Sequence, residues 1–234
     1  MYSFKSRVRF SETDHNGKLK FSSLMDYFQD ASTFHSKSVE LGIDREIENN
    51  RAWVVSYWQI EIDRYPMLYE NIKTGTFPTS YKGAVGNRNF FMEDEEGNMI
   101  ARAKSVWAYV DTANGHPVRI TKEDVERYGS DNLFELEDIG RKVERGSNPI
   151  LKETFKVRKE HIDRNEHVNN CRYIEMAMEY VPLDMEVYKA RVSYKKSALY
   201  GYTIYPYVSE EDNRIVVELS DENKNPYCII EFSI

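Results

Sequence analysis

The sequence DRNEHVNNCRY at residues 163–173 has a shorter copy, DHNGKL, near the start of the chain at residues 14–19. Both copies contain an aspartate followed two residues later by an asparagine, but the first carries Lys18 where the second carries His167. A motif that occurs twice, with an imidazole at its fifth position in the second copy only, indicates a duplicated fold. We therefore expect the second half of the chain to have retained the chemistry.

Each copy is followed by apolar residues that recur every three to four positions, which predicts an amphipathic helix after each motif. Pro182 should stop the second helix, because proline lacks the amide proton that a helix interior needs. Gly42 is the expected end of the first helix. The positions that define the two apolar faces are Leu24, Phe28, Ala31 and His35 in the first half, and Tyr173, Ile174, Ala177, Met178 and Val181 in the second.

Strand patterns separated by turn residues follow each helix. A helix followed by an antiparallel meander of about four strands, made twice, is typical of an α+β tandem hot-dog fold, in which each half packs one long helix on a curled sheet. The expected strands are 53–62, 69–77, 80–92 and 99–110 in the first half, and 187–195, 202–208, 214–219 and 227–232 in the second.

Duplication also predicts the domain organisation. We expect an N-terminal hot-dog at residues 1–120, a charged linker at 121–152 and a C-terminal hot-dog at 153–234. Within the linker, the sequence that begins at Thr121 predicts a short capped helix.

Composition excludes several classes of function. The formal net charge of −7 argues against general nucleic-acid binding, which needs clustered Lys and Arg. The basic clusters at 141–145, 156–159 and 195–196 are expected to be solvated surface, with docking of an acidic partner as the alternative. No apolar run approaches the ~20 residues of a membrane span, and the start of the chain lacks a signal-peptide pattern. We expect a cytoplasmic protein.

The second motif could form a polar site. In an extended segment, residues two apart point to the same side, so Asp163, Asn165 and His167 could line one wall. The helix N-terminus that follows offers amide donors and partial positive charge to an oxyanion in an acyl-transfer reaction. The alternative is structural, because Asp, Asn and His also favour turns, and Asn169 or Asn170 could cap the helix.

No cofactor or metal is expected. The remaining histidines lack the spacing of a metal site, and Cys171 is expected to be a small packed residue rather than a nucleophile. Tryptophans could line a long apolar cavity, although core packing is the alternative. The histidines are His15, His35, His116 and His161, and the tryptophans are Trp53, Trp58 and Trp107.

The string D-x-N-x-H-V-N-N-x-x-Y at 163–173 resembles the signature of plant and bacterial acyl-acyl carrier protein thioesterases, which are tandem hot-dog proteins that hydrolyse fatty acyl thioesters. Similar segments occur in the same order over nearly the whole chain. They are Asp14 with Gly17, Gln29-Asp30-Ala31, Trp53-Val54, Arg64-Tyr65-Pro66, Arg88-Asn89-Phe90, Asp94 with Gly97, Ser105-Val106-Trp107 and Pro117-Val118-Arg119.

The resemblance implies a role for each site residue. Asn165 and His167 would polarise the thioester carbonyl or the attacking water, and Asp163 would orient them. The family carries an acidic residue, thought to act as a base, after a basic pair on a later strand. Here Lys195-Lys196 is followed by Ser197, which cannot deprotonate water at neutral pH but could hydrogen-bond a water that His167 activates.

These observations favour hydrolysis of fatty acyl-acyl carrier protein, which would act as the macromolecular partner. The first half would then shape the acyl pocket. An acyl-coenzyme A thioesterase is one alternative. A non-catalytic or weakly catalytic acyl-binding protein is another, motivated by Ser197. The chain would work as a monomeric pseudo-dimer or as a homodimer.

Overall fold

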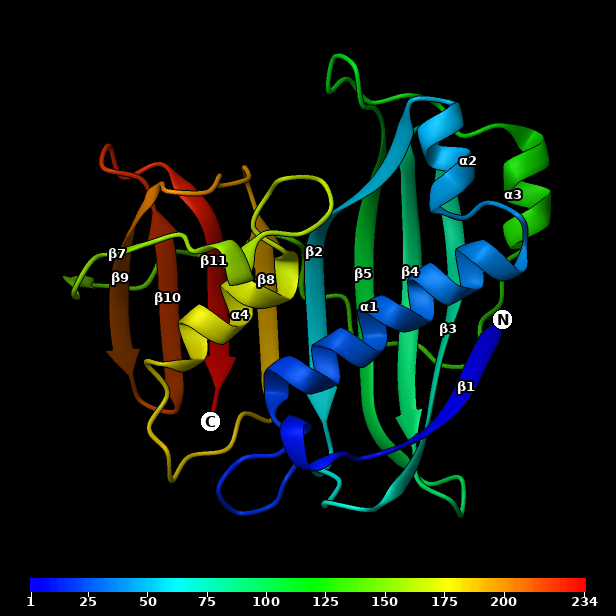
Figure 1. The fold of residues 1–234 in the computed structure, drawn as a ribbon. Coiled ribbons are helices and arrows are strands. Elements are labelled where there is room, and N and C mark those ends of the chain that lie inside the picture. The colour runs from blue at the N-terminus through cyan, green and yellow to red at the C-terminus, as the bar shows by residue number, and fades with distance from the viewer. The chain divides into compact units, whose positions relative to one another are not determined.

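Each copy of the repeated motif leads into a helix that packs on an antiparallel sheet (Figure 1). The computed structural model describes all residues, 1–234. The chain forms two compact units, Met1–Ile139 and Gly140–Ile234. The α+β tandem hot-dog architecture expected from the sequence is therefore confirmed.

The first unit contains a five-stranded antiparallel sheet in the order β1-β3-β4-β5-β2. Helix α1 packs on β1, β3 and β4. Its elements are β1 (Tyr2–Arg7), the 3-10 helix η1 (Phe10–Glu12), α1 (Phe21–Ser38), α2 (Ile43–Glu48), β2 (Arg51–Ile62), β3 (Asn71–Lys82), β4 (Val85–Glu93), β5 (Met99–Asp111) and α3 (Lys122–Tyr128).

The second unit repeats this plan with a shorter helix. Its sheet runs β8-β11-β10-β9, and the short strands β6 and β7 both pair with β9. Helix α4 packs on β10 and β11. The elements are β6 (Ile150–Leu151), β7 (Phe155–Lys156), η2 (Lys159–His161), α4 (Asn170–Met178), β8 (Lys189–Tyr194), β9 (Thr203–Glu211), β10 (Arg214–Ser220) and β11 (Pro226–Ser233).

The apolar faces of both helices are buried as predicted. In α1, Leu24, Phe28 and Ala31 are fully buried, and Phe28 packs against Phe90 with ring centroids 5.5 Å apart. Helix α4 ends at Met178, before Pro182, as the sequence indicated.

The expected end of α1 at Gly42 is wrong. The helix ends at Ser38, and Glu40 turns the chain with a φ of 62°. Gly42 has an extended backbone instead and is the N-cap of α2. The turn was missed because a glutamate occupies the left-handed position that usually favours glycine or asparagine.

Eight strands correspond to the predicted ones, but one boundary is wrong. The break expected between residues 77 and 80 lies inside β3, where the pairing with β4 shifts register between Pro78 and Ser80. A proline is tolerated at such an irregularity because one ladder hydrogen bond is already lost there. The true turn lies at Gly83, whose φ is 64°.

The stretch predicted to be a linker is divided between the two units, and its first part packs on the first unit. The predicted capped helix is confirmed as α3, where the Thr121 hydroxyl accepts a hydrogen bond from the Asp124 amide at 3.0 Å. Tyr128 at its end is buried, and its hydroxyl bonds Ser36 of α1 at 3.0 Å.

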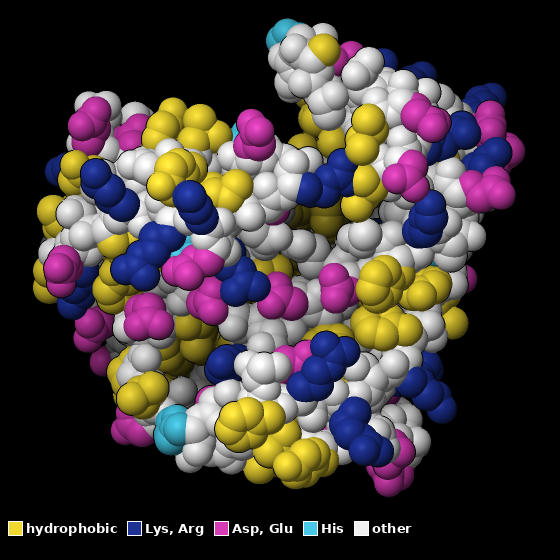
Figure 2. All heavy atoms as spheres, viewed as in Figure 1, with side chains coloured by type: hydrophobic (Ala, Val, Ile, Leu, Met, Phe, Trp, Pro, Cys, Tyr) yellow, Lys and Arg dark blue, Asp and Glu magenta, His cyan; other side chains and the backbone are white.

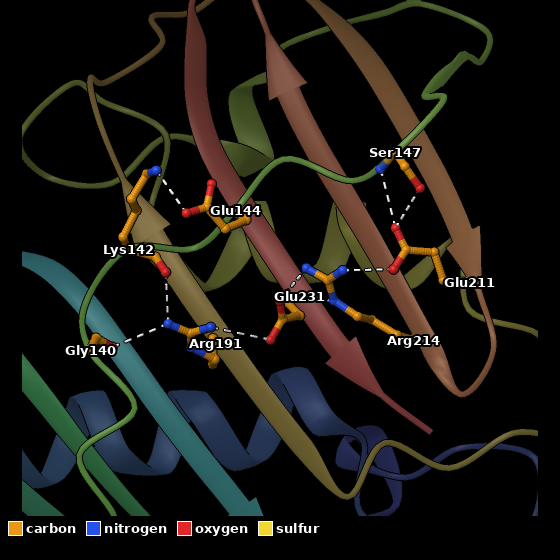
Figure 3. A network of polar contacts seen from close by, with 8 residues as sticks. All are labelled: Gly140, Lys142, Glu144, Ser147, Arg191, Glu211, Arg214 and Glu231. Carbon is orange, nitrogen blue, oxygen red and sulfur yellow. Dashed lines mark hydrogen bonds and ion pairs between the residues drawn. The ribbon is translucent and has the colours of Figure 1, made fainter.

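Residues 140–147 belong to the second unit and lie along its sheet (Figure 3). Arg191 of β8 donates to the carbonyl of Lys142 at 2.7 Å, and Glu211 of β9 accepts from Ser147. Gly146 comes so close that an added Cβ would lie 2.2 Å from Ser209. This part of the expected linker is therefore held on the sheet by polar contacts and a close backbone approach.

Candidate active site

The second motif folds into a closed loop that presents His167. The Asp163 amide donates to the His167 carbonyl at 2.8 Å, and the Glu166 amide donates to the Asp163 carbonyl at 3.1 Å. The Asp163 carboxylate accepts from the Asn165 amide at 2.8 Å. The loop is thus fixed by its own aspartate, and α4 begins three residues after His167.

The first motif folds in the same way. The Asp14 amide donates to the Lys18 carbonyl at 2.8 Å, and the Gly17 amide donates to the Asp14 carbonyl at 3.1 Å. The Asp14 carboxylate accepts from the Asn16 amide at 2.8 Å. Both loops pass through a left-handed residue, Gly17 with a φ of 76° and Glu166 with a φ of 62°. The duplication predicted from the motif therefore extends to individual hydrogen bonds.

The extended segment predicted for residues 163–167 is wrong, because this stretch is a tight turn. The Asp163 carboxylate binds the amide of its own loop instead of lining a wall with the other two side chains. Asn165 and His167 are both exposed, whereas Asp163 is half-buried. Asp163 therefore holds the shape of the loop.

The structure places the segment that contains Ser197 next to the His167 loop. Leu199 forms an isolated antiparallel bridge with His167, and the Val168 amide donates to the Ala198 carbonyl at 3.0 Å. Ser197 is exposed, as is His167. Two side chains that are 30 residues apart in the sequence thus come from neighbouring backbone segments.

The two lysines before Ser197 differ in their contacts. Lys196 forms an ion pair with Asp221 and lies 4.7 Å from the centre of the Tyr227 ring. Hydrogen bonds from Lys196 and from the Asn225 amide hold the pKa of the Asp221 carboxyl well below its usual range. Lys195 is exposed. Across the face in Figure 2, positive and negative side chains are interspersed.

The start of α4 is capped by a side chain. Asn169 is the N-cap, and its side chain accepts from the Cys171 amide at 2.8 Å. This confirms the structural role considered for Asn169. The cap occupies one of the amide donors expected for an oxyanion, although the partial positive charge of the helix end remains.

Tyr173 has a role that sequence reasoning missed, because it was assigned only to the apolar face of the helix. Its ring is buried, and its hydroxyl accepts from the Ala198 amide at 2.7 Å. Burial raises the pKa of Tyr173. The available signal was the alignment of the two motifs, in which Leu24 stands in the place of this tyrosine.

The remaining histidines belong to surface or core. His15 and His116 are exposed, and His161 accepts from the Arg158 amide at 3.0 Å within η2. His35 is buried and lies 2.9 Å from Arg88 through its Nδ1 atom. Burial, reinforced by the Arg88 charge, lowers the pKa of His35 to about 3.

Cys171 is buried, as expected of a small packed residue. No group of three or more His, Cys, Asp or Glu side chains is arranged to hold a metal ion. None of the helices combines the length and apolar character needed to cross a membrane.

The three tryptophans lie in the first unit, where they pack against other side chains. Trp58 is buried against Phe90, with ring centroids 4.7 Å apart. Trp107 donates to the Ser105 hydroxyl at 2.6 Å. Trp53 lines a pocket of 330 Å³ between α2, α3 and the sheet.

These features define a class: tandem hot-dog proteins in which a polar loop before the second helix carries a histidine at the position that is a lysine in the first copy of the motif. Two family models cover most of the chain. The acyl-ACP thioesterase N-terminal domain matches residues 1–128, and the C-terminal domain matches residues 146–230. The chain belongs to the acyl-ACP thioesterase family.

Individual relatives agree with this assignment. The chain is 30% identical over 175 residues to the acyl-[acyl-carrier-protein] hydrolase FATB3, chloroplastic, of Cuphea viscosissima, a match that covers 69% of this chain and 42% of that protein. It is 26% identical over 205 residues to a palmitoyl-acyl carrier protein thioesterase of Gossypium hirsutum, covering 78% and 48%. The chain thus spans less than half the length of these curated relatives.

Solved structures show the same fold. An acyl-ACP thioesterase from Bacteroides thetaiotaomicron superposes with a TM-score of 0.90 at 24% identity, covering 99% of this chain and 96% of that one. A 12:0-ACP thioesterase from Umbellularia californica superposes with a TM-score of 0.87 at 17% identity, with the same coverage of 99% and 96%.

Proposed function

We propose that this protein hydrolyses the thioester of a fatty acyl chain on acyl carrier protein and releases the free fatty acid, a reaction of fatty acid biosynthesis. One observation carries the proposal. The chain folds the same loop twice and has an imidazole, His167, at the position where the first loop has Lys18, beside the segment that contains Ser197. Family membership and the names of the relatives, which are acyl carrier protein hydrolases, support the same reaction.

In the proposed reaction, a water molecule attacks the thioester carbonyl carbon. His167 accepts a proton from the water, and the Asn165 amide donates a hydrogen bond to the carbonyl oxygen as it gains negative charge. The carbon–sulfur bond then breaks, and His167 returns the proton to the leaving sulfur. Asp163 keeps both side chains in place through the loop, and Ser197 holds the water by a hydrogen bond.

We also propose a division of labour between the halves. The first half, with its longer helix and aromatic core, would shape the acyl pocket, and the second half would carry the catalytic loop. One chain with two fused halves would be the working unit, alone or as a homodimer.

We propose a cytoplasmic location, although the curated plant relatives are named chloroplastic. Sedimentation tests the oligomeric state, and cell fractionation tests the location.

Ser197 motivates one alternative function, a weakly catalytic or non-catalytic acyl-binding protein. Serine is a poor base for water, so a protein with this fold and loop could bind an acyl chain without hydrolysing its thioester. In its non-catalytic form, this alternative predicts tight binding of fatty acid and no hydrolysis of any thioester.

The test is an assay of the purified protein against matched acyl-carrier-protein and acyl-coenzyme A thioesters of several chain lengths, with free acid measured by mass spectrometry. We expect turnover, with a higher kcat/KM for carrier-protein thioesters. Faster hydrolysis of the coenzyme A series at equal concentration would identify an acyl-coenzyme A thioesterase instead. Binding of fatty acid without hydrolysis in either series would contradict enzymatic function.

A further inference from the structure

The amide of Ala198 is a buried backbone donor at the edge of the candidate site. Ala198 has no exposed surface, so this amide needs a partner within the protein. The partner is the Tyr173 hydroxyl of α4, at 2.7 Å. On its other side, the Ala198 carbonyl accepts from the Val168 amide at 3.0 Å, next to His167. Ala198, the residue that follows Ser197, thus joins the helix to the His167 loop.

The first half of the chain lacks this hydrogen bond at both ends. Lys18 bridges to Met67 as His167 bridges to Leu199, so Pro66 corresponds to Ala198. The Pro66 carbonyl accepts from the Leu19 amide at 2.9 Å, which matches the bond made by Ala198. Proline has no amide proton to donate. Leu24, six residues after Lys18, stands where Tyr173 stands six residues after His167, and leucine has no acceptor.

A second tyrosine shows the same contrast. The Tyr194 hydroxyl donates to the carbonyl of Asn170, the first residue of α4, at 3.0 Å. Ile62, four residues before Pro66, corresponds to Tyr194, and Phe21, three after Lys18, corresponds to Asn170. Both first-half residues are buried and apolar. Tyrosine hydroxyl bonds therefore hold the helix start and the 197–199 segment only in the half that contains His167.

We propose that Tyr173 is a positioning residue for the thioesterase reaction. Its hydroxyl fixes the backbone of residues 197–199 against α4, so that Ser197 keeps its place relative to the His167 loop. The proposal rests on the proposed function above. It adds a residue that touches neither water nor thioester but sets the geometry of the groups that do.

The physical reason is the cost of leaving a buried amide without an acceptor. Replacing Tyr173 by Phe would keep the ring and remove the only hydrogen bond of the Ala198 amide. The backbone would then shift or open to give that amide another partner. Small displacements of catalytic groups lower the rate strongly, and loss of a supporting hydrogen bond can cost about 10-fold to 100-fold.

The experiment compares Tyr173→Phe with Tyr194→Phe, which removes a tyrosine hydroxyl bond of the same unit that does not reach residues 197–199. At a temperature where circular dichroism shows both variants folded, we expect Tyr173→Phe to lower kcat about tenfold or more and to leave KM within about twofold. Tyr194→Phe should lower Tm by about as much as Tyr173→Phe does, and it should keep kcat within about threefold of the parent.

Rescue separates positioning from general destabilisation. Ala198→Pro in the Tyr173→Phe background removes the orphaned amide and recreates the first-half arrangement, where Pro66 has an apolar partner at the equivalent helix position. We expect this double variant to recover about fivefold or more of the lost kcat. Amide exchange should also be about tenfold faster at Ala198 in Tyr173→Phe than in the parent.

A parent-like kcat in Tyr173→Phe overturns the proposal, and so does an equal loss of kcat in Tyr194→Phe. Unchanged exchange of the Ala198 amide overturns it as well. A parent protein that hydrolyses no thioester, while Ala198 exchange still accelerates in Tyr173→Phe, contradicts the proposed function and leaves the hydrogen bond as a purely structural one.

Discussion

At the scale of single residues, the proposed reaction depends on His167 and Ser197. Both are exposed on backbone segments joined by the His167–Leu199 bridge. In the proposed reaction the imidazole acts as the base, whereas the serine hydroxyl can only hydrogen-bond water. The candidate residues could be chosen from the motif. The contact between Tyr173 and Ala198 could not, because it joins residues 25 positions apart through a backbone amide.

Ser197→Glu should raise kcat for acyl-carrier thioesters by about tenfold, because a carboxylate next to the His167 loop supplies a second base for water. Steady-state kinetics of the parent, Ser197→Glu and Ser197→Gln test this. The glutamine variant is the control for size and should stay within about threefold of the parent. An equal gain in both variants would show that the charge is not responsible.

The loop and the helix start are the elements that present these residues. The sequence predicted both helices, the strands and the duplication, since these depend on periodicity and turn residues. It did not predict the tight turn at 163–167, because the side-chain bond from Asp163 to the Asn165 amide competes locally with an extended backbone. The end of α1 was missed for a similar reason, since Glu40 adopts an unusual φ.

Gly17→Ala should lower the free energy of unfolding by about 1 kcal/mol, because the first loop holds Gly17 at a φ of 76°. Space is not limiting, since an added Cβ would lie 3.9 Å from Met67. The reciprocal change, Glu166→Gly, should leave stability unchanged or raise it by up to about 1 kcal/mol. Urea unfolding measures both. A loss in Glu166→Gly as large as in Gly17→Ala would contradict the role of φ.

Asn169→Ala should destabilise the protein by about 1 kcal/mol, because it removes the side-chain cap on the Cys171 amide. Lys20→Ala is the matched control, since Lys20 is the N-cap of α1 and makes no side-chain cap bond. Its effect in thermal or urea unfolding should be within about 0.5 kcal/mol of zero. Equal losses in the two variants would argue against the cap.

At the scale of the whole molecule, the two units share one plan but differ in their buried polar groups. The first unit buries His35 and Arg88 between α1 and the sheet, and the Arg88 guanidinium also lies 5.6 Å from the centre of the Tyr128 ring. The second unit holds residues 140–147 on its sheet through Arg191, Arg214 and their partners (Figure 3). Sequence pattern predicts neither arrangement, because both depend on tertiary pairing.

His35 gives the stability of the protein a pH dependence. Its pKa is about 3 in the folded protein, against an ordinary value of 6.5, so the unfolded chain binds a proton that the folded chain excludes. This contribution to stability is complete above about pH 6.5 and is lost as pH falls toward 3, with a slope of up to about 1.4 kcal/mol per pH unit. His35→Asn keeps an acceptor for Arg88 and removes the titration.

Urea unfolding between about pH 3.5 and 7.5, a range that covers most of the interval between the two pKa values, checks this. We expect a smaller loss of stability in His35→Asn than in the parent as pH falls. His15→Asn, at an exposed site, is the control and should follow the parent. Parallel curves for the parent and His35→Asn would show that His35 does not titrate on unfolding.

The hydrolysis of acyl-carrier-protein thioesters by the parent, His167→Gln and His116→Gln tests the proposed reaction most directly. His116 is exposed outside both motif loops, so its variant controls for the same chemical change. We predict that His167→Gln lowers kcat/KM by about 100-fold or more, while His116→Gln stays within about twofold of the parent. A His167→Gln protein that is as active as the parent would contradict the assignment of the catalytic role to the second loop.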